Sequence, residues 1–293
     1  MKVVLFCGGQ GMRIREHSGA IPKPMVTIGY RPILWHLMRY YAFYGHTDFI
    51  LCLGYQGDVI KRYFMEYREW MSNDFVLSNG GQSVECFSRD IEDWRITFVD
   101  TGRLANVGQR LMAVRPHLED EEVFLANYAD VLTDLPLPIL LRHFEEHENI
   151  VTFVAVRPSQ TFHVVDINGG GAVERLRLAS RADLWVNGGF FVLNRKIFDY
   201  MQADDELVDQ PFQRLIECGR LTAYRHEGFW VGMDTFKEWQ QLEDLYTQGR
   251  APWALWDDGR RPASPMRWPG RGRLQTVLEP WVPEIGSPED RIG

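Results

Sequence analysis

The feature that most constrains this chain is a glycine loop that directly follows a short apolar segment near the N-terminus. Residues 3–7 read Val-Val-Leu-Phe-Cys, and residues 8–11 read Gly-Gly-Gln-Gly. A short apolar run that ends at glycines is typical of a buried strand. Glycines let the backbone approach a ligand closely and direct N–H groups toward it. Because the cations Arg13 and Lys23 follow, this region predicts a cradle for nucleotide phosphates.

The loop differs from the two common phosphate-binding loops. It lacks the Gly-Lys-Ser/Thr ending of a P-loop, and its glycines do not have the Gly-x-Gly-x-x-Gly spacing. The kind of nucleotide site therefore has to be inferred from the motifs that follow.

Composition excludes several classes of protein. The 293 residues are 45% apolar and carry a net charge of −8, which does not fit non-specific nucleic-acid binding. No apolar run reaches the roughly 18–20 residues that a membrane span needs, and the N-terminus does not resemble a signal peptide. The cysteines are far apart without C-x-x-C spacing, which favours free thiols in the cytoplasm; they are Cys7, Cys52, Cys86 and Cys218.

Strand-like and helical patterns alternate along the first half of the chain. This alternation predicts a mostly parallel sheet with helices on both faces, with ligands bound at the carboxyl ends of the strands. The predicted strands are 3–7, 49–53, 96–100 and 123–126, and the predicted helices are 32–44 and 59–71.

The second half has a different pattern, which predicts an antiparallel extension of the sheet followed by helices. The predicted strands there are 151–156, 163–167 and 189–193, and the predicted helices are 195–201, 211–218 and 236–248. Residues 257–293 are rich in Pro, Arg and Gly, which indicates an irregular tail after one domain that covers residues 1–256.

Six motifs in order along residues 1–256 resemble the sugar-1-phosphate nucleotidyltransferases, and in particular their glucose-1-phosphate cytidylyltransferase branch. The glycine loop with Arg13 is followed by Pro-Lys-Pro at 22–24 and Pro-Ile-Leu-Trp-His at 32–36. Later matches are Gly-Tyr-Gln-Gly at 54–57, Val-Asp-Thr-Gly at 99–102 with Gly-Gln-Arg at 108–110, Asn-Gly-Gly-Phe-Phe at 187–191, and Gly-Phe-Trp at 228–230 with Met-Asp-Thr at 233–235.

The resemblance implies a three-layer, Rossmann-like α/β nucleotidyltransferase fold with an antiparallel extension on the sugar side. It also implies attack by the phosphate of a sugar 1-phosphate on the α-phosphate of a nucleoside triphosphate, with release of pyrophosphate. Magnesium is the implied cofactor, CTP is the favoured donor with UTP or dTTP as the alternative, and a homo-oligomer is expected.

The resemblance also assigns roles to individual residues. Arg13, Lys23, Asp130 and Asp234 would be catalytic, and the two aspartates would hold magnesium, since carboxylate oxygens suit this ion. Nucleotide contacts would come from Gly8, Gly9, Gly11, Met12 and Arg110. Sugar-side contacts would come from Tyr128, Asn187 and Gly188. By contrast, Trp35 and His36 are expected to be packing residues on their helix.

Two departures from the family bear on specificity. Met12 replaces a loop Thr or Ser, so a hydroxyl contact to the nucleotide is lost. The Glu-Lys pair, which in the family holds sugar hydroxyls and the sugar phosphate, is absent before Asn187. Arg175, Arg177 or Arg181 could replace the lysine, because arginine suits bidentate phosphate contacts. The acceptor could therefore be a modified sugar, a heptose, a cyclitol phosphate or another phosphorylated metabolite.

Two other functions stay open. A non-catalytic nucleotide-binding relative would fit the missing Glu-Lys pair and Met12, but would not need Asp130 and Asp234. A glycosyltransferase of similar architecture would carry an Asp-x-Asp metal motif, which Asp-Val-Leu-Thr-Asp at 130–134 does not supply.

Overall fold

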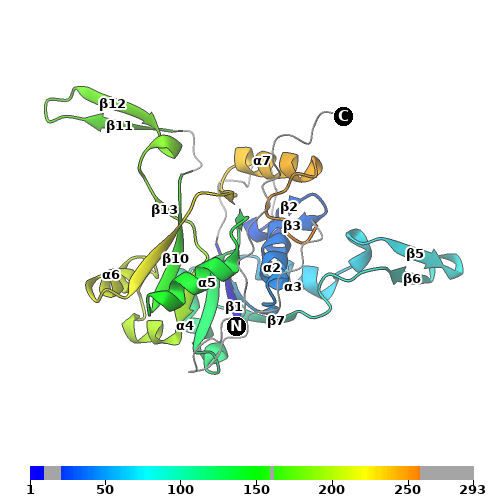
Figure 1. Ribbon diagram of the computed structural model, residues 1–293. Helices are drawn as coiled ribbons and strands as arrows, with labels where there is room; N and C mark the ends of the chain where they lie inside the picture. The colour runs from blue at the N-terminus through cyan, green and yellow to red at the C-terminus, as the bar shows by residue number, and fades with distance from the viewer. Residues whose placement is uncertain (10–20, 159–161, 258–293) are drawn as a thin grey trace.

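The computed structural model describes residues 1–9, 21–158 and 162–257, which form a three-layer α/β fold around one large sheet (Figure 1). Strands β7, β4, β1 and β8 are neighbours in that order and run parallel. The eight strands of the sheet are β1 (Val3–Phe6), β4 (Asp48–Leu53), β7 (Arg95–Asp100), β8 (Val123–Tyr128), β10 (Val151–Val156), β13 (Val186–Asn187), β14 (Phe191–Asn194) and β15 (Leu221–His226).

The second half of the chain adds the predicted antiparallel part to the sheet, but the strand predicted over residues 163–167 lies outside it, in a separate two-stranded sheet with residues 173–178. Strand β14 is antiparallel to both β8 and β10, and β15 is parallel to β10. Strand β13 is also antiparallel to β10. Within the described sheet, only β13 and β14 are therefore antiparallel to the other strands. This confirms the expected fold class, with a mostly parallel sheet and some antiparallel strands.

The side chains of the central strands alternate between two cores, one on each face of the sheet. In β1, Val3 and Leu5 face one core while Val4 and Phe6 face the other, as the two-residue period of a strand requires. Helices α2 (Ile33–Phe43), α3 (Gly57–Met65), α5 (Leu137–Glu146) and α7 (Phe236–Thr247) contribute to the first core. Helices α4 (Val107–Val114) and α6 (Gln210–Glu217) contribute to the second.

The helix predicted over residues 59–71 is split. Helix α3 ends at Met65, and a separate 3₁₀ turn η2 (Glu69–Met71) follows. Between them the carbonyl of Arg68 accepts a hydrogen bond from the buried Arg31 guanidinium at 2.9 Å, a long-range contact that a local pattern does not predict. The other 3₁₀ turns are η1 (Lys23–Met25), η3 (Asn79–Gly81), η4 (Arg115–Leu118), η5 (Ala179–Arg181) and η6 (Arg195–Tyr200), the last replacing the helix predicted over residues 195–201.

Four small two-stranded sheets complete the part of the fold that the structure describes. Two of them, β5 with β6 and β11 with β12, project from the body of the molecule as hairpins (Figure 1). The strands are β2 (Thr27–Ile28), β3 (Arg31–Pro32), β5 (Phe75–Ser78), β6 (Ser83–Cys86), β9 (Val131–Thr133), β11 (His163–Ile167), β12 (Val173–Leu178) and β16 (Trp230–Gly232).

Candidate active site

Two predicted catalytic aspartates meet because β9 and β16 form an antiparallel pair. Val131 lies opposite Gly232, and the ladder continues one step further through a 2.9 Å bond from the Met233 N–H to the Asp130 carbonyl. Asp130 directly precedes β9, and Asp234 follows β16 with one residue between them. Because the two strands are antiparallel, both aspartates lie at the same end of the β9–β16 pair. The structure thus brings together two carboxylates that are more than a hundred residues apart in sequence.

Lys23 joins the two aspartates. Its ammonium makes an ion pair with Asp130 and a second ion pair with Asp234 at 2.6 Å. The lysine comes from η1, where Pro22 and Pro24 flank it and restrict the backbone. Three of the four predicted catalytic residues are therefore adjacent.

The charge of Lys23 is stabilised despite its burial. Its side chain is 14% exposed, and burial opposes the charged form. The carboxylates of Asp130 and Asp234 outweigh this effect and hold the pKa of Lys23 above its ordinary value. The lysine is therefore a permanent cation at the centre of the cluster at physiological pH.

The start of α7 holds the backbone on both sides of the Asp234 side chain. The Glu238 carboxylate accepts hydrogen bonds from the N–H groups of Asp234 and Thr235 at 2.7 and 2.8 Å. Thr235 caps the helix in return, through a bond from the Glu238 N–H, which is a capping box. Because Glu238 satisfies these N–H groups, the Asp234 carboxylate can face Lys23.

The donors of this cluster fit magnesium. The described residues contain no group of three or more acidic, histidine or cysteine side chains placed to hold a metal. Mg²⁺ is usually bound by one or two carboxylates, with waters and substrate phosphates completing the shell. Two aspartates and one lysine give the cluster one net negative charge. The two carboxylates therefore suit a divalent cation that binds together with the phosphates of a substrate.

Arg110 acts on the backbone of the predicted phosphate cradle. Its guanidinium donates to the carbonyls of Gly8, Leu53 and Gly102 at 2.9, 3.1 and 3.1 Å, and to the Thr101 hydroxyl at 2.7 Å. These acceptors follow or end the parallel strands β1, β4 and β7. A Cβ atom at Gly8 would overlap the guanidinium, which explains why glycine is needed there. In this structure Arg110 joins the ends of three strands.

The predicted sugar-side residues lie together at the interruption between β13 and β14, which pair with the same side of β10. Asn187 donates to the Tyr128 hydroxyl at 3.1 Å and accepts from the Gly189 N–H at 2.9 Å. Burial raises the pKa of Tyr128 to about 12, so its hydroxyl stays protonated. Gly188 is buried beside them, and its carbonyl accepts from the Trp230 indole at 2.8 Å.

Asn127 is a supporting residue that the sequence reasoning missed. Its side-chain oxygen accepts from the N–H groups of Tyr128 and Phe190, both at 2.9 Å, and it is fully buried. The signal in the sequence was a lone amide inside an otherwise apolar strand, because such a group needs a specific partner.

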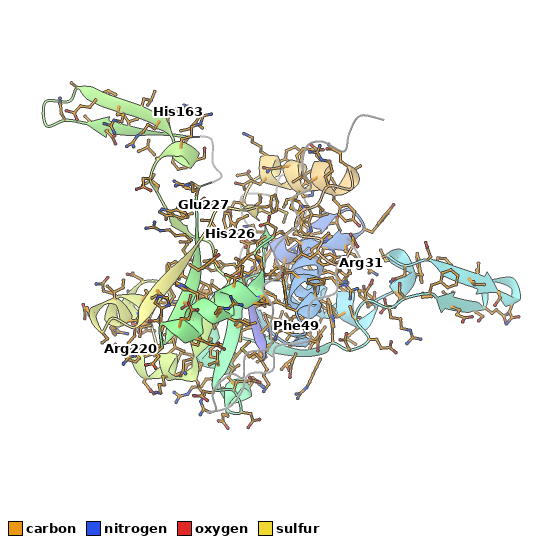
Figure 2. All side chains as sticks on the ribbon, in the orientation of Figure 1. Arg31, Phe49, His163, Arg220, His226 and Glu227 are labelled. Atoms are coloured by element: carbon orange, nitrogen blue, oxygen red, sulfur yellow. The ribbon has the colours of Figure 1, made fainter. Side chains whose placement is uncertain are left out.

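A second missed pair fixes the approach to β16. His226 Nε2 lies 2.8 Å from the Asp134 carboxylate, which also accepts from the Phe229 N–H at 2.9 Å. Figure 2 shows His226 near the centre of the molecule, at the end of β15. This contact ties the loop that leads to Asp234 to the residue that follows β9.

The structure does not bring the two candidate phosphate clamps Arg175 and Arg177 to the cluster. Both lie on β12, in the projecting hairpin (Figure 1), and Arg177 is paired with Asp166 at 2.7 Å. Arg181, in η5, is exposed. Gly9 is exposed at the end of the first described segment. Gly11, Met12, Arg13 and the tail from residue 258 lie outside the described residues.

Comparison with known proteins identifies the family. Residues 2–240 match the family model for nucleotidyl transferase. Glucose-1-phosphate cytidylyltransferase of Salmonella typhimurium is 39% identical over 259 residues, which are 88% of this chain and 100% of that protein. A probable glucose-1-phosphate cytidylyltransferase of Bacillus subtilis is 36% identical over 258 residues, with 87% and 100% coverage.

Solved structures share the fold. HddC from Yersinia pseudotuberculosis has a TM-score of 0.59 at 19% identity, covering 84% of this chain and 99% of that chain. A putative glucose-1-phosphate thymidylyltransferase from Bacillus anthracis has a TM-score of 0.61 at 15% identity, with 84% and 94% coverage. Among the described residues, no helix has the length and apolar character to span a membrane. On the family match and the two relatives aligned over their full length, the chain belongs to the nucleotidyl transferase family, as a sugar-1-phosphate nucleotidyltransferase similar to glucose-1-phosphate cytidylyltransferases.

Proposed function

We propose that this enzyme is magnesium-dependent and joins CTP to a phosphorylated sugar, releasing pyrophosphate. The observation that carries the proposal is the convergence of Asp130 and Asp234 on the partly buried Lys23. The cytidylyltransferases of Salmonella and Bacillus, at 39% and 36% identity, support CTP over UTP or dTTP.

The proposed reaction is a single displacement at phosphorus. An oxygen of the sugar phosphate attacks the α-phosphorus, a new P–O bond forms, and the bond from the α-phosphorus to the bridging oxygen breaks as pyrophosphate leaves. Such chemistry needs mainly positioning and charge neutralisation. Lys23 supplies a fixed positive charge, and Arg110 holds the backbone of the phosphate cradle in place.

Asp130 and Asp234 would hold magnesium. The bound ion would offset negative charge on the substrate phosphates. Glu238 would keep the backbone of Asp234 in position when metal and substrates bind, because its carboxylate accepts hydrogen bonds from the N–H groups of Asp234 and Thr235.

The test is pyrophosphate release with Mg²⁺, measured for CTP, UTP, GTP, ATP and dTTP against a panel of sugar 1-phosphates. We expect release with CTP, and a loss of at least a hundredfold in kcat for Asp130→Asn, since removing even one preorganised hydrogen-bond donor from an active site costs about 10²–10³ in rate. The exposed Asp120 supplies the matched control, Asp120→Asn, which should keep full activity.

Two results would contradict the proposal. One is nucleotide binding without pyrophosphate release for every acceptor, together with metal-dependent binding that Asp130→Asn leaves unchanged. This outcome would favour the non-catalytic alternative. The other is release with UTP or dTTP in preference to CTP, which would overturn the choice of base alone.

A further inference from the structure

Two arginines converge on one tryptophan beside the sugar-side residues. The Arg157 guanidinium carbon lies 4.7 Å from the centre of the Trp185 ring, and that of Arg225 lies 5.1 Å from it. The three residues come from segments far apart in sequence: Arg157 follows β10, Arg225 is in β15, and Trp185 precedes β13.

The strand register places this group next to Asn187. Ala155 of β10 lies opposite Arg225 on one side and opposite Asn187 on the other. Residues opposite one another in neighbouring strands point to the same face of a sheet. Arg225 and Asn187 therefore share the face on which Asn187 contacts the Tyr128 hydroxyl.

In the described part of the chain, neither Arg157 nor Arg225 forms an ion pair, whereas Arg177 on the nearby hairpin is paired with Asp166. Arg157 donates one hydrogen bond, to the Ala182 carbonyl at 2.9 Å, and Arg225 is exposed. Two guanidinium groups held on one ring repel each other, so an anion placed near both would be favourable.

The Trp185 ring holds both arginines in place. Stacking on an aromatic ring restricts a guanidinium while leaving its N–H groups free to bond. Arginine binds phosphate and carboxylate groups through two parallel hydrogen bonds. The group therefore has the chemistry of an anion site.

We propose that Arg157 and Arg225, supported by Trp185, bind a phosphate or carboxylate group of the acceptor. This proposal rests on the proposed function and deepens it. The family's Glu-Lys pair is absent from this chain, and the proposal assigns the binding of the acceptor's negative group to other residues. Arg157 and Arg225 thus take the acceptor-binding role that was expected for Arg175 and Arg177.

The experiment is calorimetric titration in the presence of CTP and EDTA, so that binding is read without turnover. The probes are inorganic phosphate, glucose 1-phosphate and glucuronic acid 1-phosphate. The variants are Arg157→Gln and Arg225→Gln. The control is Arg68→Gln, which removes another arginine that lies over a tryptophan, at 5.9 Å from Trp70.

We expect Arg157→Gln and Arg225→Gln to weaken binding of at least one sugar phosphate about tenfold or more, because charge-assisted hydrogen bonds are lost. Equal losses for both sugar phosphates assign the site to the phosphate that they share. A loss confined to glucuronic acid 1-phosphate assigns it to a second anionic group. Arg157→Lys, which keeps the charge, should recover part of the affinity, and unchanged thermal melting should show that each variant folds.

Unchanged binding of all three probes in both glutamine variants overturns the anion site, as does an equal loss in Arg68→Gln. These outcomes are separate from the proposed function. Failure of pyrophosphate release with intact, arginine-dependent binding would remove the proposed activity and leave the anion site standing. Pyrophosphate release, with sugar-phosphate binding that is independent of both arginines, would support the proposed activity and remove the anion site.

Discussion

At the scale of single residues, buried polar side chains hold the loops of the site through specific hydrogen bonds. Arg110 is 4% exposed and bonds to backbone groups after three strands. His36 is 1% exposed; its Nε2 lies 3.0 Å from the Ile28 carbonyl, and its Nδ1 accepts from the Trp253 indole at 3.3 Å. Loss of Arg110 should alter both stability and ligand binding, because it acts on the backbone of the phosphate cradle. Loss of His36 should alter stability, because it acts on packing.

Replacing Arg110 by methionine should loosen the phosphate cradle. The buried Gly8 carbonyl would lose its donor, and leaving a buried acceptor unsatisfied costs about 1–3 kcal/mol. We expect a lower free energy of unfolding in urea together with a higher KM for CTP. The nearby Arg103, which is exposed, provides the control Arg103→Met. A normal KM for CTP in Arg110→Met would show that the cradle does not depend on this residue.

His36 should make the protein sensitive to acid. Burial lowers its pKa to about 4 from an ordinary 6.5, and the positive charge of Arg31 acts in the same direction. Below pH 6.5 the unfolded chain binds a proton that the folded chain does not. Stability is therefore greatest above pH 6.5 and falls toward pH 4. This residue should contribute a loss of about 2 kcal/mol between pH 6.5 and 5.

The measurement is the free energy of unfolding at pH 7 and pH 5 for the unmodified chain and for His36→Gln. Burial also lowers the pKa of His46 to about 4, but this residue is present in both proteins, so its effect cancels in the comparison. Equal losses on acidification in the two proteins would contradict the assignment to His36.

At the scale of elements, the site depends on strands that stop at defined points. Strands β13 and β14 pair with the same edge of β10, and residues 188–190 interrupt them. Gly189 and Phe190 have φ angles of +76° and +50° there, in the left-handed region that favours glycine. The interruption directly follows Asn187, the last residue of β13, whose side-chain amide donates to the Tyr128 hydroxyl.

Gly189→Ala should damage this interruption. A Cβ atom there would overlap the side-chain oxygen of Asn127, and the positive φ adds strain of order 1–3 kcal/mol. We expect reduced stability in urea and a higher KM for the sugar phosphate than for CTP. The matched control is Gly170→Ala, where a Cβ would make only an ordinary contact. Equal changes in the two KM values would mean that the interruption does not serve the acceptor side.

At the scale of the whole molecule, two hairpins project from the three-layer body (Figure 1). The β5–β6 hairpin is attached through a buried ionic network. The Arg31 guanidinium lies 3.6 Å from the Asp90 carboxylate, and Ser72 donates to the same carboxylate at 2.5 Å. Arg31 also stacks over Tyr67 at 4.1 Å. This network connects the segment around the hairpin to the start of α2.

Removing one member of the network should destabilise the protein strongly. Asp90→Ala leaves the Arg31 charge buried, and breaking a buried pair in this way costs about 3–5 kcal/mol. The double variant Arg31→Met, Asp90→Ala should recover much of that loss, because no unpaired charge remains. Urea unfolding measures both, with the exposed Asp93→Ala as the control. A double variant as unstable as Asp90→Ala would contradict the electrostatic explanation.

Much of the fold could be predicted from local pattern. The strand predicted over 49–53, the helix over 32–44 and the helix over 236–248 correspond to β4, α2 and α7 within a few residues. Each has a strong apolar period or a clear boundary, such as Pro32 before α2 and Thr235 before α7. The helix predicted over 59–71 was wrong at its C-terminal end, because Arg31, distant in sequence, binds the backbone of Arg68 there.

The sequence by itself determined the family and the order of strands and loops, because motifs and periodicity are local patterns that can be recognised without knowing the tertiary contacts. Only the tertiary structure decided which polar residues meet. It joined Lys23, Asp130 and Asp234 through the β9–β16 ladder, and it separated Arg175 and Arg177 from them on a hairpin. It also gathered Arg157, Arg225 and Trp185. The physical reason is that such contacts depend on strand register and on the pairing of distant segments, which no local stretch of sequence encodes.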